Sequence, residues 1–171
     1  AATGSVQIAV KLFKGEVTSD GYPADELDCC LTTGAHPCLI KVVAHISQKD
    51  QLGLVMALIP EEFRNLGLPL NLDTCTRDTI TADSQFSLTD IIKIAYQLSD
   101  VMEHMHAKQV SHGDIYAHNI LIRPNFDCIL SDFGAASIYA GLSDDISSQL
   151  EAIEVRAYSV LIQELFLKLT S

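Results

Sequence analysis

The chain has 171 residues, of which 48% are hydrophobic, and its formal net charge is −11. This length and hydrophobic content support one compact unit or two small lobes and exclude an extended disordered chain. The negative charge argues against binding to nucleic-acid backbones or to anionic membranes, and no apolar run has the length of a membrane span. The five cysteines include no CxxC pair, which favours reduced thiols in a cytoplasmic protein over disulfides or a zinc site.

The first predicted element is a β-strand over residues 6–13, which contains Lys11. A helix is predicted from Ala24 to about Thr33, because Pro23 favours a helix start and apolar residues recur three and four positions apart. Glu26 lies in the first turn of this helix, where an acid also favours the helix dipole. Asp25 is the competing acid at this point of the chain.

Gly34 to Pro37 end the helix, and residues 39–46 and 52–59 then predict two strands around a turn. Residues 60–86 are polar and rich in turn formers. They predict a linker with short, irregular helical structure, and we attach no function to it.

The next predicted element is a long amphipathic helix that ends near Lys108. Ser87 and Asp90 fit a capping box, and apolar residues recur at helical spacing from Leu88 to Met105. His104 and His106 are two positions apart, so they face different sides of the helix and a metal site between them is not expected.

The most informative run is His112-Gly113-Asp114-Ile115-Tyr116-Ala117-His118-Asn119, followed thirteen residues later by Asp132-Phe133-Gly134. Between them, residues 120–122 and 128–130 predict a β-hairpin with its turn at Pro124 and Asn125. An aspartate, an asparagine five residues later and a second aspartate in this spacing suit the binding of Mg²⁺-ATP and of a hydroxyl acceptor. After a small and polar stretch, apolar residues from Ile153 to Leu165 predict a final helix.

These runs together resemble the protein kinase superfamily, most densely over residues 86–136. The resemblance implies an α+β, two-lobed fold with a small antiparallel N-lobe (1–59) and a mainly helical C-lobe (60–171), in which the N-lobe is truncated and the C-lobe stops after the helix around Glu154. The sequences of the motifs are most similar to those of compact bacterial protein kinase domains, including domains attached to leucine-rich repeats. No such repeat occurs here. Residues Glu154 to Val160 resemble the buried scaffold helix of the C-lobe.

The resemblance also implies roles for single residues. Asp114 would orient the acceptor hydroxyl, Asn119 and Asp132 would bind Mg²⁺, and Lys11, held by Glu26, would contact the phosphates of ATP. His112 and Phe133 would support these groups internally, and His36 is expected to be structural. The expected adenine contacts are Ala9 and Leu121 as an apolar sandwich, Met56 as the gatekeeper, and Ala57 and Leu58 as backbone partners.

Several features depart from the family pattern. No G-x-G-x-x-G run precedes Lys11, Gly113 replaces the usual arginine, and no A-P-E motif follows Asp132. Tyr116 stands where Ser/Thr kinases carry a lysine, and His118 would replace that cation only partly.

The function implied is an ATP- and Mg²⁺-dependent phosphotransferase, with a protein serine or threonine favoured as the acceptor. Two alternatives remain open from the sequence: a pseudokinase that binds a nucleotide or a partner, and a small-molecule kinase of the aminoglycoside or choline type. The sequence does not identify the substrate, the regulator or the oligomeric state.

Overall fold

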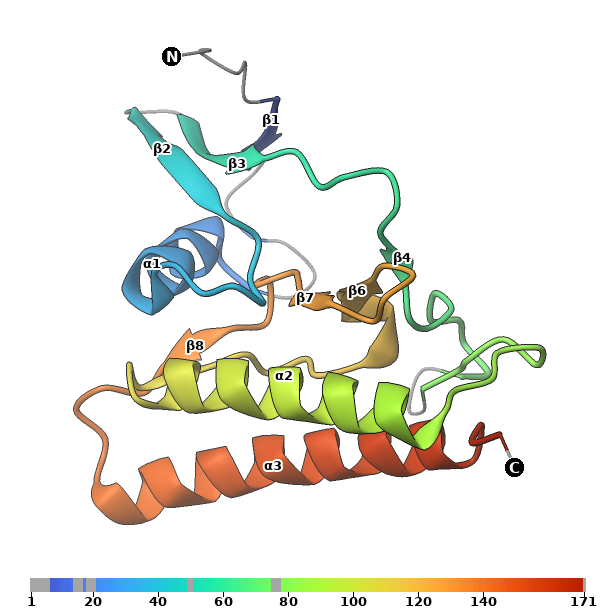
Figure 1. The fold of residues 1–171 in the computed structure, drawn as a ribbon. Coiled ribbons are helices and arrows are strands. Elements are labelled where there is room, and N and C mark those ends of the chain that lie inside the picture. The colour runs from blue at the N-terminus through green and yellow to red at the C-terminus, as the bar shows by residue number, and fades with distance from the viewer. Residues whose placement is uncertain (1–6, 14–16, 18–20, 49–50, 75–77, 171) are drawn as a thin grey trace.

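The computed structural model describes residues 7–13, 17, 21–48, 51–74 and 78–170. The chain forms two lobes, a small antiparallel sheet with one helix and a larger, mainly helical part (Figure 1). In the described part of the chain, no helix combines the length and the apolar character needed to cross a bilayer.

The sheet of the first lobe has the order β1-β3-β2, with β1 at Ile8–Leu12, β2 at Val42–Gln48 and β3 at Gln51–Ala57. Both pairings are antiparallel, and Lys11 lies opposite Leu54. The expected strands are therefore confirmed, with bounds that differ by up to three residues.

Helix α1 (Pro23–Thr33) packs beside this sheet (Figure 1). Pro23 is at its first turn and Gly34, with φ +71°, closes its C-terminal end, as the sequence indicates. The expected apolar face consists of Leu27, Cys30 and Leu31, and of these Leu27 is buried and Cys30 half-buried, whereas Leu31 is exposed. The buried face of the helix also includes Glu26, Cys29 and Thr33.

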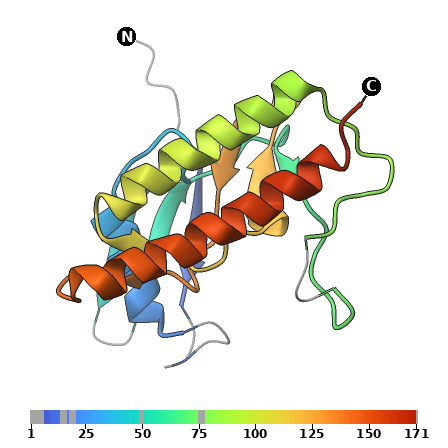
Figure 2. The same cartoon turned by 90° about the horizontal axis from the view of Figure 1, so that it is seen from below.

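Helix α2 (Leu88–His106) and helix α3 (Asp144–Phe166) form the base of the second lobe and lie side by side (Figures 1 and 2). The capping box is present in full: Asp90 N–H donates to Ser87 Oγ, and Ser87 N–H donates to Asp90 Oδ2. Helix α3 begins earlier than the apolar stripe suggested, because Asp144 and Asp145 stabilise its first turn through the helix dipole.

The middle of the molecule contains short strands above α2. Strands β4 (Arg64–Asn65), β6 (Ile120–Ile122) and β7 (Cys128–Leu130) form one sheet, and β5 (Val110–Ser111) pairs with β8 (Ser137–Ile138). The β6–β7 hairpin has the predicted bounds. A 3₁₀ turn, η1 (Ala117–Asn119), leads into β6.

The main core lies between α2, α3 and the hairpin. It contains fully buried side chains from each element, namely Ile91, Ile94, Leu98, Met105, Ile120, Leu130, Leu161 and Leu165. The expected helical structure in residues 60–86 is wrong for the described residues 60–74 and 78–86, which form turns and β4. Pro60, Gly67 and Pro69 explain this, since neither residue type favours a helix interior.

Candidate active site

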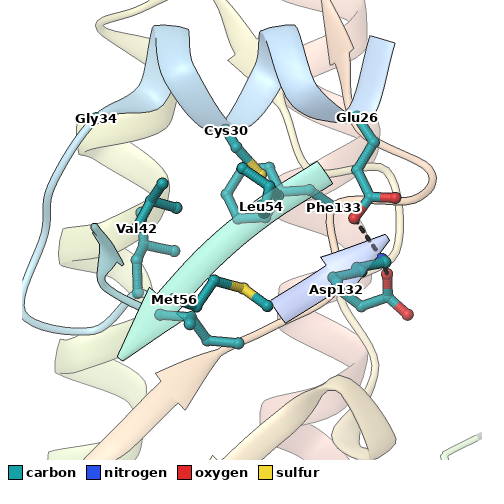
Figure 3. Close-up of a pocket in the computed structure, with 11 residues that line it drawn as sticks. Glu26, Cys30, Gly34, Val42, Leu54, Met56, Asp132 and Phe133 are labelled. Atoms are coloured by element: carbon teal, nitrogen blue, oxygen red, sulfur yellow. Dashed lines mark hydrogen bonds and ion pairs between the residues drawn. The ribbon is translucent and has the colours of Figure 1, made fainter. Parts of the chain in front are cut away.

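Lys11 forms two ion pairs, one with Glu26 in the first lobe and one with Asp132 in the second. Lys11 Nζ on β1 lies 2.5 Å from Glu26 Oε1 on α1 and 3.9 Å from Asp132 Oδ1 (Figure 3). The Glu26 side chain is nearly buried, with 9% of its surface exposed. The side chains of Lys11 and Asp132 are 41% and 55% exposed. The lysine is therefore fixed from inside and open toward the cleft.

The acidic loop after β5 is organised by Asn119. Its Nδ2 donates to Asp114 Oδ2 at 2.7 Å and to the Asp114 carbonyl at 3.1 Å. The Asn119 carbonyl accepts from both the backbone and the hydroxyl of Ser131, the residue before Asp132. Asn119 thus links the loop of Asp114 to the loop of Asp132.

Asp132 adopts a left-handed backbone conformation with φ +62°. Aspartate and asparagine are among the few side chains that adopt this region at low cost. Its Oδ1 accepts from the Gly134 N–H, which fixes the carboxylate at the start of the turn.

His112 supports both loops from beneath. Its Nε2 lies 3.0 Å from the Ser131 carbonyl, and the Asp114 N–H donates to its Nδ1. These partners require a proton on Nε2 and none on Nδ1. The ring is fully buried, and burial lowers the pKa of His112, so the imidazole is neutral. The Phe133 ring packs against it with centroids 5.3 Å apart.

Glu154 on α3 holds the backbone of the same loop. Its Oε1 accepts from the N–H groups of His112 and Gly113 at 2.7 and 2.9 Å, and its Oε2 lies 2.6 Å from His106 Nε2. The resemblance of this segment to a scaffold helix indicates a buried position, but the hydrogen bonds to the loop and the pairing with His106 are not evident from the sequence.

His118 and Asp78 lie near the opposite side of the loop. His118 Nε2 is 3.8 Å from Asp114 Oδ2, so this imidazole lies beside the carboxylate of the expected catalytic aspartate. The Asp78 carboxylate accepts a hydrogen bond from the Ala117 N–H, and burial raises the pKa of Asp78. Asp78 lies in the linker to which we attached no role, and no motif marks it.

A cavity of about 200 Å³ opens behind the Lys11–Glu26 pair (Figure 3). Met56 lines it, together with Cys30, Val42, Leu54 and Phe133, and the gatekeeper role of Met56 stays a prediction. Four expected adenine contacts do not line this cavity: Ala9, Ala57, Leu58 and Leu121.

The backbone amides of Ala57 and Leu58, the expected backbone partners of adenine, already donate hydrogen bonds within the protein. The Ala57 N–H donates to the Lys41 carbonyl at 2.9 Å, and the Leu58 N–H donates to the Gln7 carbonyl at 3.0 Å. Neither amide is available to an adenine ring in this structure, so a backbone contact of Ala57 or Leu58 with adenine stays a prediction for their carbonyls. The sequence pattern misses this because strand pairing at the end of β3 is a tertiary property.

The oxygen ligands that suit Mg²⁺ are present. Asn119 uses its nitrogen toward Asp114, which turns its side-chain oxygen to the other side, and the Asp132 carboxylate is half exposed. Within the described ranges, no cluster of three His, Cys, Asp or Glu side chains is placed to hold a metal ion. An asparagine, an aspartate and phosphate oxygens together fit the hard cation better than a cage of protein ligands alone.

The arrangement of these groups on a two-lobed fold is that of a protein kinase domain. A family model described as protein tyrosine and serine/threonine kinase matches residues 1–161, and the chain belongs to this family.

A probable receptor-like protein kinase of Arabidopsis thaliana is 32% identical over 116 residues, which are 66% of this chain and 31% of the relative. The chain therefore spans about a third of the length of this relative. The relative is a plant protein, and the expected likeness to bacterial domains stays a prediction.

Proposed function

We propose that this domain transfers the γ-phosphate of ATP to a hydroxyl group of a protein, with serine or threonine as the favoured acceptor. The observation that carries the proposal is the contact of Asn119 with Asp114, together with the placement of Lys11 between Glu26 and Asp132. The kinase family supports the reaction class. The acceptor residue rests on the sequence resemblance alone.

In this proposal, residues 1–59 form the N-lobe of the domain, and residues 60–171, which include the linker, form the C-lobe. Lys11 binds the phosphates of the nucleotide, and Glu26 keeps the ammonium group of Lys11 in place. Ala9, Met56 and Leu121, with the backbone around Ala57 and Leu58, would surround the adenine. Since the amides of Ala57 and Leu58 are engaged, their carbonyls remain as the groups to accept from the adenine amino group.

Asn119 and Asp132 would hold Mg²⁺, which neutralises charge on the phosphates when it is bound. Asp114 would accept a hydrogen bond from the acceptor hydroxyl and orient its oxygen toward the γ-phosphorus. The hydrogen bond from Asn119 holds the Asp114 carboxylate in one orientation, so little reorganisation is needed when the acceptor arrives.

We also propose a cytoplasmic site of action. Cys29, Cys30, Cys38 and Cys128 are free thiols, which persist in a reducing compartment. The net charge of −11 supports a protein partner over nucleic acid or an anionic membrane.

The test is Mg²⁺-dependent ATP turnover and autophosphorylation by the wild type, by Asp114→Asn and by Asp132→Asn. Asp28→Asn is the matched control, since Asp28 is exposed on the outer side of α1. We expect each site variant to lose at least about 10²-fold in turnover and the control to lose none. Nucleotide binding without turnover in the wild type would instead establish a pseudokinase. Turnover that needs an added aminoglycoside or choline would establish a small-molecule kinase.

A further inference from the structure

Two buried cysteines from different lobes meet where the lobes touch. Cys38 lies in the loop between α1 and β2, and Cys128 begins β7 in the second lobe. Their side chains are 6% and 2% exposed and belong to one apolar cluster. The side chain of each is close enough to influence the pKa of the other.

The backbone holds these two segments together. The Leu130 N–H donates to the Cys38 carbonyl at 2.8 Å, and Leu39 forms a parallel bridge with Leu130. The approach of the two cysteines is therefore a property of the main chain and does not depend on side-chain rotamers alone. Leu130 is two residues after Cys128 on β7, so this contact keeps the backbone of Cys38 next to the strand that carries Cys128.

We propose that Cys38 and Cys128 form a reversible disulfide under peroxide and thereby cross-link the two lobes. This inference is independent of the phosphotransferase activity. It assigns a modification site to residues that have no place in the proposed chemistry.

The electrostatics favour this pair over the other described cysteines. The side chain of Cys128 lowers the pKa of Cys38, and the side chain of Cys38, together with burial, raises the pKa of Cys128. Burial raises the pKa of Cys29 to about 11 and that of Cys30 to about 12. Of these four thiols, Cys38 is the one with a lowered pKa, and we therefore assign to it the thiolate that attacks a peroxide.

The reaction balances with hydrogen peroxide as the oxidant. The Cys38 thiolate attacks one peroxide oxygen and the O–O bond breaks, which leaves a sulfenic acid on Cys38 and a hydroxide that takes up a proton. Cys128 sulfur then attacks Cys38 sulfur, the S–O bond breaks, and the hydroxyl leaves as water with the Cys128 proton. Two thiols lose two electrons and two protons, and one peroxide becomes two waters.

The cross-link would act on the proposed active site through the backbone. Strand β7 leads through Ser131 to Asp132, and the Cys38 loop follows the helix that carries Glu26. A bond between Cys38 and Cys128 would therefore restrain α1 relative to Asp132.

The experiment treats the reduced 171-residue chain with hydrogen peroxide, blocks the remaining thiols and maps the peptides without reduction. Cys75→Ser serves as the background, since Cys75 lies outside the described residues. We expect one cross-linked peptide pair that joins Cys38 to Cys128, a mass lower by two hydrogens, and full reversal by dithiothreitol. The thermal midpoint should rise by about 5 °C or more after oxidation, because the bond closes a long loop.

Cys38→Ser and Cys128→Ser should each abolish the cross-link, whereas Cys30→Ser, on α1 but away from this contact, should leave it intact. Two results would overturn the proposal: oxidation of Cys38 to sulfinic acid without a cross-link, or a cross-link to Cys29 or Cys30 instead. Circular dichroism identifies a serine variant that fails to fold. In that case, peptide mapping of the Cys75→Ser protein, which keeps both Cys38 and Cys128, still shows which cysteines are cross-linked.

Discussion

His106 on α2 and Glu154 on α3 form a nearly buried ion pair, with 2.6 Å between Nε2 and Oε2. The carboxylate uses its other oxygen for the N–H groups of His112 and Gly113, immediately before Asp114. The hydrogen bond with Glu154 raises the pKa of His106. Burial opposes ionisation of Glu154, but hydrogen bonds from His106 and Gly113 outweigh burial and lower its pKa. One carboxylate thus joins the two long helices to the loop of the proposed active site.

This ion pair predicts a pH-dependent contribution to stability. The raised pKa of His106 means that its protonated form stabilises the fold below the ordinary value of 6.5, and that this contribution is lost as the pH rises through the raised pKa. The lowered pKa of Glu154 means that its contribution is present above the ordinary value of 4.5 and is lost as the pH falls through the lowered pKa. The pair contributes most between these two values.

We therefore expect His106→Gln to reduce the free energy of unfolding by about 1–3 kcal/mol near pH 5.5 and by less at pH 9. Urea unfolding of the wild type and of His106→Gln at several pH values measures the difference in the free energy of unfolding. Because His112 is present in both proteins, its own titration cancels in this difference. His45→Gln is the control, because His45 is exposed on β2. A difference between wild type and His106→Gln that stays constant with pH would contradict the assigned ion pair.

Removal of the Glu154 carboxylate should be more damaging than removal of His106. Glu154→Ala leaves the N–H groups of His112 and Gly113 and the Ser111 hydroxyl without their acceptor. We expect a loss of about 3–5 kcal/mol in the free energy of unfolding, as for the breaking of a buried pair. Gln163→Ala, at an exposed position of the same helix, should change it by less than about 0.5 kcal/mol. Denaturant titration of the wild type, Glu154→Ala and Gln163→Ala measures these losses, and the value for His106→Gln completes the comparison.

Gly113 stands where the family carries an arginine, and its environment explains the glycine. Its φ is +77°, and a Cβ there would lie 2.4 Å from the Ala135 carbonyl oxygen. Gly113→Ala should therefore cost about 2–4 kcal/mol, part from the left-handed backbone and part from displacement of the loop after Asp132.

Gly141→Ala separates the two effects. Gly141 has φ +86° and no atom within 4 Å of the added Cβ, so only the backbone cost of about 1–2 kcal/mol applies. Thermal unfolding of both variants measures the two costs. Equal losses would show that the contact with Ala135 carries no energy.

The Lys11–Glu26 pair predicts that Glu26→Gln reduces the proposed phosphoryl transfer. The amide keeps the shape of the side chain but loses the charge that holds the ammonium group 2.5 Å away. We expect turnover to fall by about 10–100-fold, with a rise in the KM for ATP. Asp25→Asn, the neighbouring acid that competed for this role, is exposed and should behave as the wild type. The reverse order of the two variants would assign the pair to Asp25.

The sequence predicted those features that depend on short spacings. The capping box at Ser87, the hairpin at 120–122 and 128–130, and the two strands around residue 50 all follow from local patterns, and the family confirms the two-lobed fold. Start and end signals of this kind act within a few residues, so one chain is enough to find them.

Tertiary features were not accessible in this way. The engagement of the Ala57 and Leu58 amides depends on which strands meet at the edge of β3, and the pair of His106 with Glu154 joins residues far apart in sequence. The absence of helix in the described residues 60–74 and 78–86 shows the same limit, since turn formers outweigh weak periodicity there.

The hydrogen bond between Leu130 and Cys38 is one of several contacts that join the lobes besides the chain around residue 60. His104 Nε2 lies 2.8 Å from the Thr33 carbonyl at the end of α1, and His36 Nε2 lies 3.1 Å from Asp100 Oδ2 on α2. These contacts attach the end of α1 and the loop after it to the second lobe. A shift of the sheet relative to α1 would therefore change the separation of Lys11 on β1 from Glu26 on α1.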